Sequence, residues 1–181
     1  MSKLSGVDEK LFIRMKLFKN KFKIESSRLK DWDYSTPWWY YVTICTKNFK
    51  NWFGEIKNGE MILNDLGKQV EKCWLNISNH YPNIELDYYV IMPNHFHGIL
   101  ILNNVETGHA PSLRKHKPTL GNVVGSFKSA VSKWSHNNIF DDFKWQPRFY
   151  DHIIRNENDL RMIRTYIQNN PTKWELDEYY K

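Results

Sequence analysis

The chain has 181 residues, of which 41% are hydrophobic and 25% charged, which is enough for one domain with a buried core. No apolar run approaches the roughly 20 residues of a membrane-spanning helix, and the polar start does not resemble a secretory signal, so we expect a cytoplasmic protein with no membrane partner. Cys45 and Cys73 form no cluster that could close a zinc site. The net charge of +6 and the 15% of aromatic residues suit phosphate attraction and base stacking, although many basic proteins bind no nucleic acid.

Residues 1–35 are a basic segment without a clear helical or strand period. We expect an arm that is either solvated or in contact with the DNA backbone, because phosphate contact needs only charge and reach. One domain over 36–175 and a tail over 176–181 then make up the rest of the chain. The cationic residues of the arm include Lys10, Arg14, Lys16, Lys19, Lys21, Lys23, Arg28 and Lys30.

The first elements after the arm are a strand, a hairpin and a helix. Residues 38–46 are dense in aromatic and β-branched side chains, which is typical of a buried strand. The pair Asn58-Gly59 predicts a tight turn and therefore a hairpin over 52–62. Asn64 then caps a helix over 64–80, whose apolar residues recur at the helical period.

The second half of the chain is also predicted to consist of strands and helices. The expected elements are strands over 84–92 and 95–102, a surface loop over 103–118, a helix over 119–136, a strand over 149–154 and a helix from Asn156 to just before Pro171. The order strand, helix, strand, strand, helix, strand predicts an α+β fold of the ferredoxin-like βαββαβ type. Such a fold has an antiparallel sheet with helices on one face, which leaves the other face free for a substrate. The last helix is additional to this pattern.

A histidine pair offers half of a metal site. His95 and His97 are two residues apart on an expected strand, so both imidazoles leave the same face and Phe96 points into the core. Two neighbouring imidazoles can hold a divalent cation. By itself the pair can also be incidental. The sequence contains neither the His-Glu-x-x-His of a zinc protease nor the Cys-x-x-Cys of a zinc deaminase.

The last helix offers a nucleophile and a third ligand. Tyr166 and Asn170 are four residues apart and therefore lie one above the other on the helix. A phenol beside a metal can attack a phosphodiester, and the Asn170 carbonyl oxygen can complete the metal's inner shell. Taken alone, a tyrosine such as Tyr166 is more often a partly buried core residue, and an asparagine such as Asn170 before Pro171 is more often a C-terminal helix cap.

Four ordered motifs together resemble the single-tyrosine HUH transposases, and most closely the REP-associated tyrosine transposases. The likeness covers about residues 28–175, and its motifs are YYVTICT at 40–46, MPNHFHG at 92–98, WQ at 145–146 with FYDHIIR at 149–155, and YIQNNP at 166–171. The resemblance implies that His95, His97 and Asn170 bind Mg²⁺ or Mn²⁺ and that Tyr166 is the nucleophile. It also implies cleavage of single-stranded DNA beside a hairpin, through a 5′-phosphotyrosine and a free 3′-OH, followed by strand transfer.

Several alternatives stay open at this point. Tyr150 is a competing nucleophile, but only Tyr166 has an amide side chain one helical turn further on. His152 is interpreted as a structural or DNA-contacting residue and is not assigned to the metal. The chain could instead be a non-cutting nucleic-acid-binding protein with the same fold, or a metal-dependent hydrolase. No motif decides between monomer and homodimer, and the candidate DNA contacts are Arg28, Lys30, Lys128, Lys133, Arg148 and Arg155.

Overall fold

The structure is a computed structural model that describes residues 16–18, 21–23, 29, 31–104 and 117–180. The chain divides into two compact units, residues 1–31 and residues 32–181. The described part of the first unit contains an antiparallel hairpin of β1 (Lys16–Phe18) and β2 (Lys21–Lys23). The candidate DNA contacts Arg28 and Lys30 lie outside the described residues, as does most of the loop expected over 103–118.

The second unit is built on a four-stranded antiparallel sheet. Its strands are β3 (Trp39–Cys45), β6 (Ile84–Ile91), β7 (His95–Leu102) and β8 (Tyr150–Ile153). They lie in the order β6-β7-β3-β8, so the first strand of the unit is in the interior of the sheet. This arrangement confirms the predicted βαββαβ topology.

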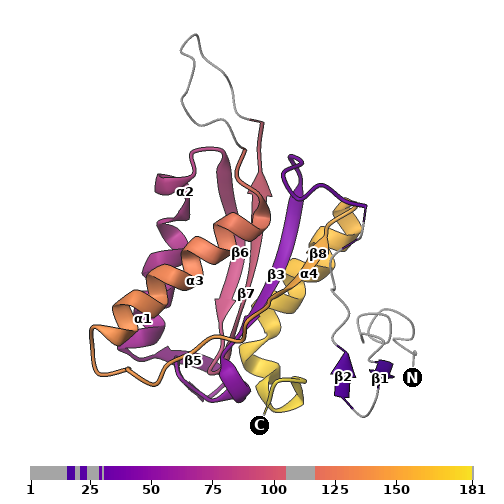
Figure 1. Cartoon of the computed structure of the whole chain (residues 1–181). Helices are drawn as coiled ribbons and strands as arrows, with labels where there is room; N and C mark the ends of the chain where they lie inside the picture. Colours follow the sequence, from indigo (N-terminus) through magenta and orange to yellow (C-terminus); the bar gives the residue numbers. More distant parts are fainter. Residues whose placement is uncertain (1–15, 19–20, 24–28, 30, 105–116, 181) are drawn as a thin grey trace, which may run out of the picture. The chain divides into compact units, whose positions relative to one another are not determined.

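Helices cover both faces of this sheet (Figure 1). The helices α1 (Asp65–Leu75), α2 (Ile77–His80) and α3 (Leu120–His136) lie on one side, and α4 (Glu157–Asn169) packs on the other. The residues that join α4 to the sheet are Tyr41, Ile99, Ile154, Leu160, Ile163 and Ile167. The expectation that this second face would be free was therefore wrong, because the apolar stripe of α4 needs a surface to bury itself against.

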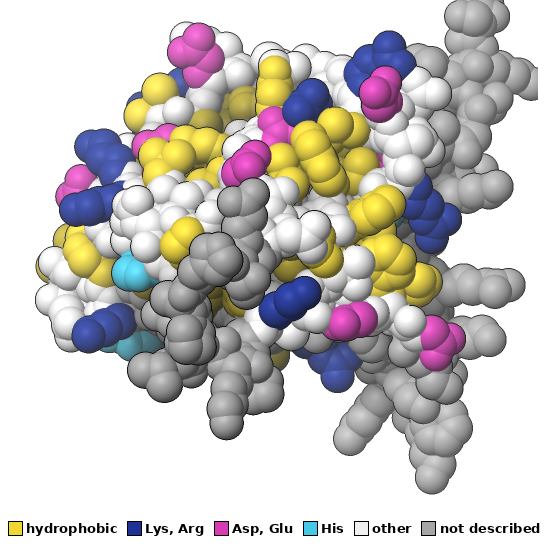
Figure 2. Space-filling view, turned by 90° about the horizontal axis from the view of Figure 1, so that it is seen from above, with side chains coloured by type: hydrophobic (Ala, Val, Ile, Leu, Met, Phe, Trp, Pro, Cys, Tyr) yellow, Lys and Arg dark blue, Asp and Glu magenta, His cyan; other side chains and the backbone are white. Residues whose placement is uncertain are grey.

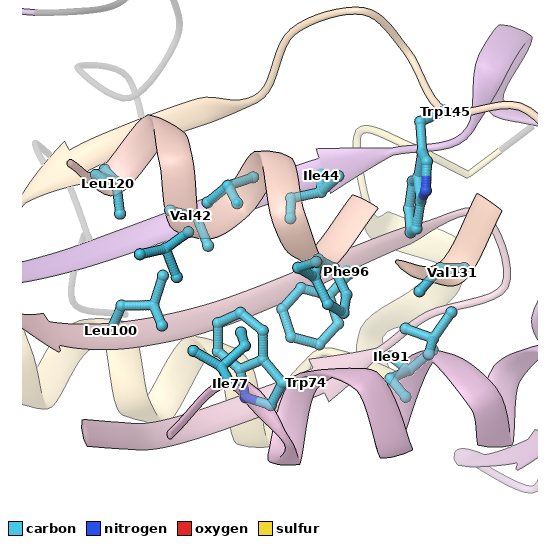
Figure 3. Close-up of a cluster of buried hydrophobic side chains, with 14 of the residues drawn as sticks. Val42, Ile44, Trp74, Ile77, Ile91, Phe96, Leu100, Leu120, Val131 and Trp145 are labelled. Carbon is cyan, nitrogen blue, oxygen red and sulfur yellow. The ribbon is translucent and has the colours of Figure 1, made fainter. Parts of the chain in front are cut away.

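The main core lies between the sheet and α1 and α3, and it is rich in aromatic side chains (Figure 3). Phe96 is fully buried, and its ring centroid lies 4.5 Å from that of Trp74 on α1. Gly98 follows on the same strand face, and a Cβ there would lie 2.5 Å from a Trp74 ring carbon. The ring of Trp74 therefore occupies the space that a larger residue at position 98 would need.

Local signals in the sequence account for most element ends. Asn64 begins α1 and accepts a hydrogen bond from the Gly67 backbone N–H, as predicted. The strands β4 (Gly54–Lys57) and β5 (Glu60–Leu63) form the expected hairpin, and both turn residues have positive φ, 53° at Asn58 and 77° at Gly59.

The helix expected over 64–80 is divided into α1 and α2. The break falls at Asn76, which ends α1 and whose side chain bonds to His80 and Asn79, two residues of the next turn. Such local side-chain bonds compete with a continuous helix, which explains the difference.

The chain does not end at α4. After Pro171, the short 3-10 helix η2 (Pro171–Leu176) leads to a final segment that returns to the end of the sheet that carries the histidines. Among the described residues, no helix is long and apolar enough to cross a membrane.

Candidate metal and nucleophile site

The two histidines lie side by side on the α4 face of the sheet. His95 pairs with Cys45 and His97 pairs with Thr43 across the β3–β7 ladder. The strand alternation sends both imidazoles to the same face, with ring centroids 4.5 Å apart, while Phe96 points into the core on the other face. His95 and His97 are at most 1% exposed. The predicted arrangement of the pair is therefore present.

A hydrogen bond of 2.8 Å joins His95 Nδ1 to Asn94 Oδ1. The Nε2 atom of His95 is buried and has no hydrogen-bond partner among the described residues. Burial, and next the proximity of His97, lowers the pKa of His95 well below its ordinary value. His95 is consequently neutral at physiological pH, as a metal ligand must be.

His97 is held by residues of the neighbouring strand β3. Its Nδ1 lies 2.7 Å from the Tyr41 hydroxyl and 2.8 Å from the Thr43 hydroxyl. Burial lowers the pKa of His97 to about 3, so this imidazole is neutral as well. The hydroxyls occupy Nδ1 and leave Nε2 facing α4, which is how outer partners commonly orient a ligating histidine.

The helix α4 brings Tyr166 and Asn170 to the histidines. Asn156 begins α4 by accepting from the Asp159 N–H, and an ion pair of 2.7 Å between Arg164 and Asp87 attaches the helix to β6. The Tyr166 hydroxyl lies 3.4 Å from His97 Nε2. Tyr166 is 42% exposed, whereas Asn170 is buried.

Asp177 completes the cluster and was missed by the sequence analysis. One carboxylate oxygen, Oδ2, lies 3.4 Å from the Tyr166 hydroxyl and accepts a 2.8 Å hydrogen bond from Asn170 Nδ2. Partial burial, followed by the negative charges of Asp177 and Glu178, raises the pKa of Tyr166 well above its ordinary value. Asp177 follows η2 in a segment without a periodic pattern, and nothing in that sequence signals that it folds back.

The ring of Tyr179 covers the histidines next to Asp177. Its centroid lies 4.6 Å from that of His95 and 6.1 Å from that of His97, and it stacks on Phe49. Its backbone carbonyl accepts a hydrogen bond of 2.8 Å from Asn94 Nδ2. The last residues of the chain thus form a wall of the site.

The cluster has the composition and the unsatisfied atoms of a cation site. His95, His97 and Asp177 each offer a ligand atom, and these atoms lie within 4.8 Å of one another. Asn170 Oδ1 is buried and, like His95 Nε2, has no hydrogen-bond partner in the described part of the chain. Buried polar atoms of this kind need a partner, and a cation with two imidazoles and one or two oxygens would supply it.

The other predicted site residues lie elsewhere. Lys128 donates a 2.6 Å hydrogen bond to the Gln146 carbonyl and braces the loop before β8, while Lys133, Arg148 and Arg155 are exposed. Figure 2 shows cationic and acidic side chains interspersed on one face. On that face, the Lys and Arg side chains of the described residues do not form a separate basic patch.

Tyr150 and His152 occupy β8. Tyr150 is half-buried and packs against the cluster that joins α4 to the sheet. His152 bonds to Asp159 near the start of α4, at 2.8 Å, and is not a member of the histidine–aspartate cluster.

No family model matches the sequence, but individual relatives do. An uncharacterized protein of Haemophilus influenzae is 42% identical over 86% of this chain and 92% of its own length. The REP-associated tyrosine transposase of Escherichia coli is 32% identical over 49% of this chain and 45% of its own length. A second Haemophilus influenzae protein, provisionally given the same name, is 27% identical over 61% of this chain and 62% of its own length. The chain thus matches less than two thirds of the length of each relative that carries that name.

The fold also matches a solved structure. A REP-associated tyrosine transposase bound to a REP hairpin superposes with a TM-score of 0.56 and 18% identity, over 83% of this chain and 76% of that one. This likeness shows that the two chains share a fold. In sequence, the chain is similar over part of its length to the REP-associated tyrosine transposases.

Proposed function

We propose that the protein cleaves single-stranded DNA beside a hairpin and transfers the strand through a 5′-phosphotyrosine intermediate on Tyr166. The main support for this proposal is the distance of 3.4 Å between the Tyr166 hydroxyl and His97 Nε2. His97 belongs to the cluster of possible metal ligands that also contains His95 and Asp177. An exposed phenol beside two neutral imidazoles and a carboxylate suits phosphoryl transfer better than a purely structural role.

His95, His97 and Asn170 are the proposed holders of a divalent cation, Mg²⁺ or Mn²⁺. The two imidazoles are neutral, and the Asn170 amide is oriented by Asp177 so that its oxygen is left for a ligand. Bound there, the cation would draw electron density from a non-bridging oxygen of the scissile phosphate and orient that phosphate for in-line attack.

Tyr166 is the proposed nucleophile and Asp177 the proton acceptor. The Tyr166 oxygen forms a bond to phosphorus while the bond from phosphorus to the 3′ oxygen breaks. The phenolic proton passes to Asp177 Oδ2, which already faces the hydroxyl at 3.4 Å, and the departing 3′ oxygen takes a proton from water. The phosphotyrosine retains the bond for rejoining by the reverse attack, so no nucleotide cofactor is needed.

Recognition of a hairpin next to an unpaired strand fits the aromatic and basic composition of the chain. The relative of known structure is bound to a REP hairpin, and we extend this class of partner to the present chain. Exposed cations such as Lys133, Arg148 and Arg155, together with the basic segment before residue 36, are the proposed contacts to the DNA backbone. The protein would act as a monomer or a homodimer.

The proposal is tested by incubating the protein with labelled, hairpin-flanked single strands and Mn²⁺. We expect a protein–DNA adduct that survives boiling in detergent, disappears with EDTA and is absent in Tyr166→Phe. Tyr150→Phe is the matched control and should retain the adduct. Hairpin binding without any adduct would support the non-cutting alternative, and an adduct that persists in Tyr166→Phe would assign the nucleophile to another residue.

A further inference from the structure

Asn94 is buried between three parts of the molecule and uses all of its polar side-chain atoms. Its Nδ2 donates to the Phe49 carbonyl at 3.0 Å and to the Tyr179 carbonyl at 2.8 Å. The side chain is 0% exposed, so no solvent competes for these bonds. Both hydrogens of the amide nitrogen therefore have carbonyl acceptors, which are groups that cannot donate.

This pair of bonds fixes which way the amide faces. If the Asn94 oxygen and nitrogen were exchanged, an oxygen would face two carbonyl oxygens, and neither contact could be a hydrogen bond. The atom that faces His95 Nδ1 at 2.8 Å is therefore Oδ1, which can only accept. It follows that the proton of this contact belongs to His95.

The proton on Nδ1 determines the state of the other ring nitrogen of His95, Nε2. A neutral imidazole carries one proton, so a proton on Nδ1 leaves Nε2 with a free lone pair. Nε2 is the buried atom that lacks a hydrogen-bond partner among the described residues, on the side of His97 and Asp177. His97 differs, because the hydroxyls of Tyr41 and Thr43 can each donate or accept and so impose no single tautomer.

We infer that Asn94 is a positioning residue, which locks His95 in the Nδ1–H tautomer and so presents Nε2 ready to bind a cation before any cation arrives. The role assigned to the cation rests on the proposed function, whereas the tautomer itself does not. Asn94 reaches the site only through His95, and its other two bonds place η1 (Lys47–Phe49) and the final segment around that imidazole.

The tautomer can be read directly in the metal-free protein from the ¹⁵N signals of its histidines, assigned with His95→Gln. In the wild type we expect a protonated Nδ1 and a bare Nε2 at His95. Asn94→Ala should lose this preference. Thr43→Val is the matched control: it removes a partner of His97 and should leave the His95 signals unchanged.

Metal affinity gives a second readout that does not depend on DNA cleavage. Mn²⁺ titration calorimetry should show a loss of about 10-fold to 100-fold in Asn94→Ala, the usual effect of removing an outer partner of a ligating histidine. A purely structural role would lower the melting temperature of Asn94→Ala and leave its His95 tautomer unchanged.

The ¹⁵N spectrum of the metal-free wild type tests the His95 tautomer even if Asn94→Ala fails to fold. A proton on Nε2 of His95 in the metal-free wild type overturns the inference, as does a Mn²⁺ affinity that Asn94→Ala leaves unchanged. A locked Nδ1–H tautomer in a protein that forms no DNA adduct would leave this inference standing and refute the proposed function instead.

Discussion

Replacing Gly98 by alanine tests how the strand that carries the histidines is packed. A Cβ at this position would lie 2.5 and 2.7 Å from two ring carbons of Trp74 and 2.8 Å from one of Phe96. Both rings are fully buried, so they cannot move aside into solvent. Overpacking of a rigid core usually destabilises by about 1–3 kcal/mol, and three such contacts place Gly98→Ala in the upper half of that range.

The matched control is Gly125→Ala on α3. A Cβ at Gly125 would meet nothing within 4 Å, and the residue is exposed inside a helix. Alanine is favoured over glycine in a helix interior by roughly 0.5–1 kcal/mol, so this variant should be more stable than the wild type.

Thermal unfolding measures both variants on the same scale. For a domain of this size, 1 kcal/mol shifts the melting temperature by roughly 2–4 °C, so Gly98→Ala should melt about 4–12 °C lower and Gly125→Ala about 1–4 °C higher. An unchanged stability of Gly98→Ala would mean that Trp74 does not fill the space beside the histidine strand, and the packing argument would be refuted.

Three further predictions concern the site itself. Asp177→Asn should slow adduct formation by about 10²-fold to 10⁴-fold, because it removes the proposed proton acceptor while keeping a side-chain oxygen that can accept from Asn170 Nδ2; an unchanged rate would argue against Asp177 as the proton acceptor. In the metal-free protein, the pKa of His97 is about 3 when folded and 6.5 when unfolded, so stability is lost as pH falls below 6.5. Urea unfolding should show that loss reaching about 2 kcal/mol at pH 5 relative to His97→Asn, and pH curves that stay parallel would contradict the assignment. Asp87→Asn should lower the free energy of unfolding by about 1–2 kcal/mol, since its partly buried pair with Arg164 attaches α4 to β6, and an unchanged urea midpoint would argue against that role.

Much of the fold was predictable because its signals are local. The alternation of side chains along β7 places both histidines on one face, and Asn64, Thr119 and Asn156 cap helices close to where the sequence suggested. The two-residue turn at Asn58-Gly59 likewise follows from the need for positive φ.

What the sequence could not predict depends on contacts between distant segments. Thr43 holds His97 because the two residues are paired across β3 and β7, and that register is not visible in either strand alone. Asp177 reaches Tyr166 because the chain turns back after Pro171, where no periodicity marks a packed element. Asn94 illustrates the same limit, since its role depends on carbonyls at positions 49 and 179.

The central claim is that the Tyr166 oxygen becomes bonded to DNA, and mapping the adduct by peptide sequencing in a mass spectrometer tests it most directly. After nuclease trimming and proteolysis of a reaction with Mn²⁺, we expect a nucleotide attached through its 5′ phosphate to the peptide that contains Tyr166. A nucleotide found on Tyr150, on Tyr179 or on a serine instead would contradict the account, because the geometry of α4 against the histidine strand would then not be that of the reacting groups.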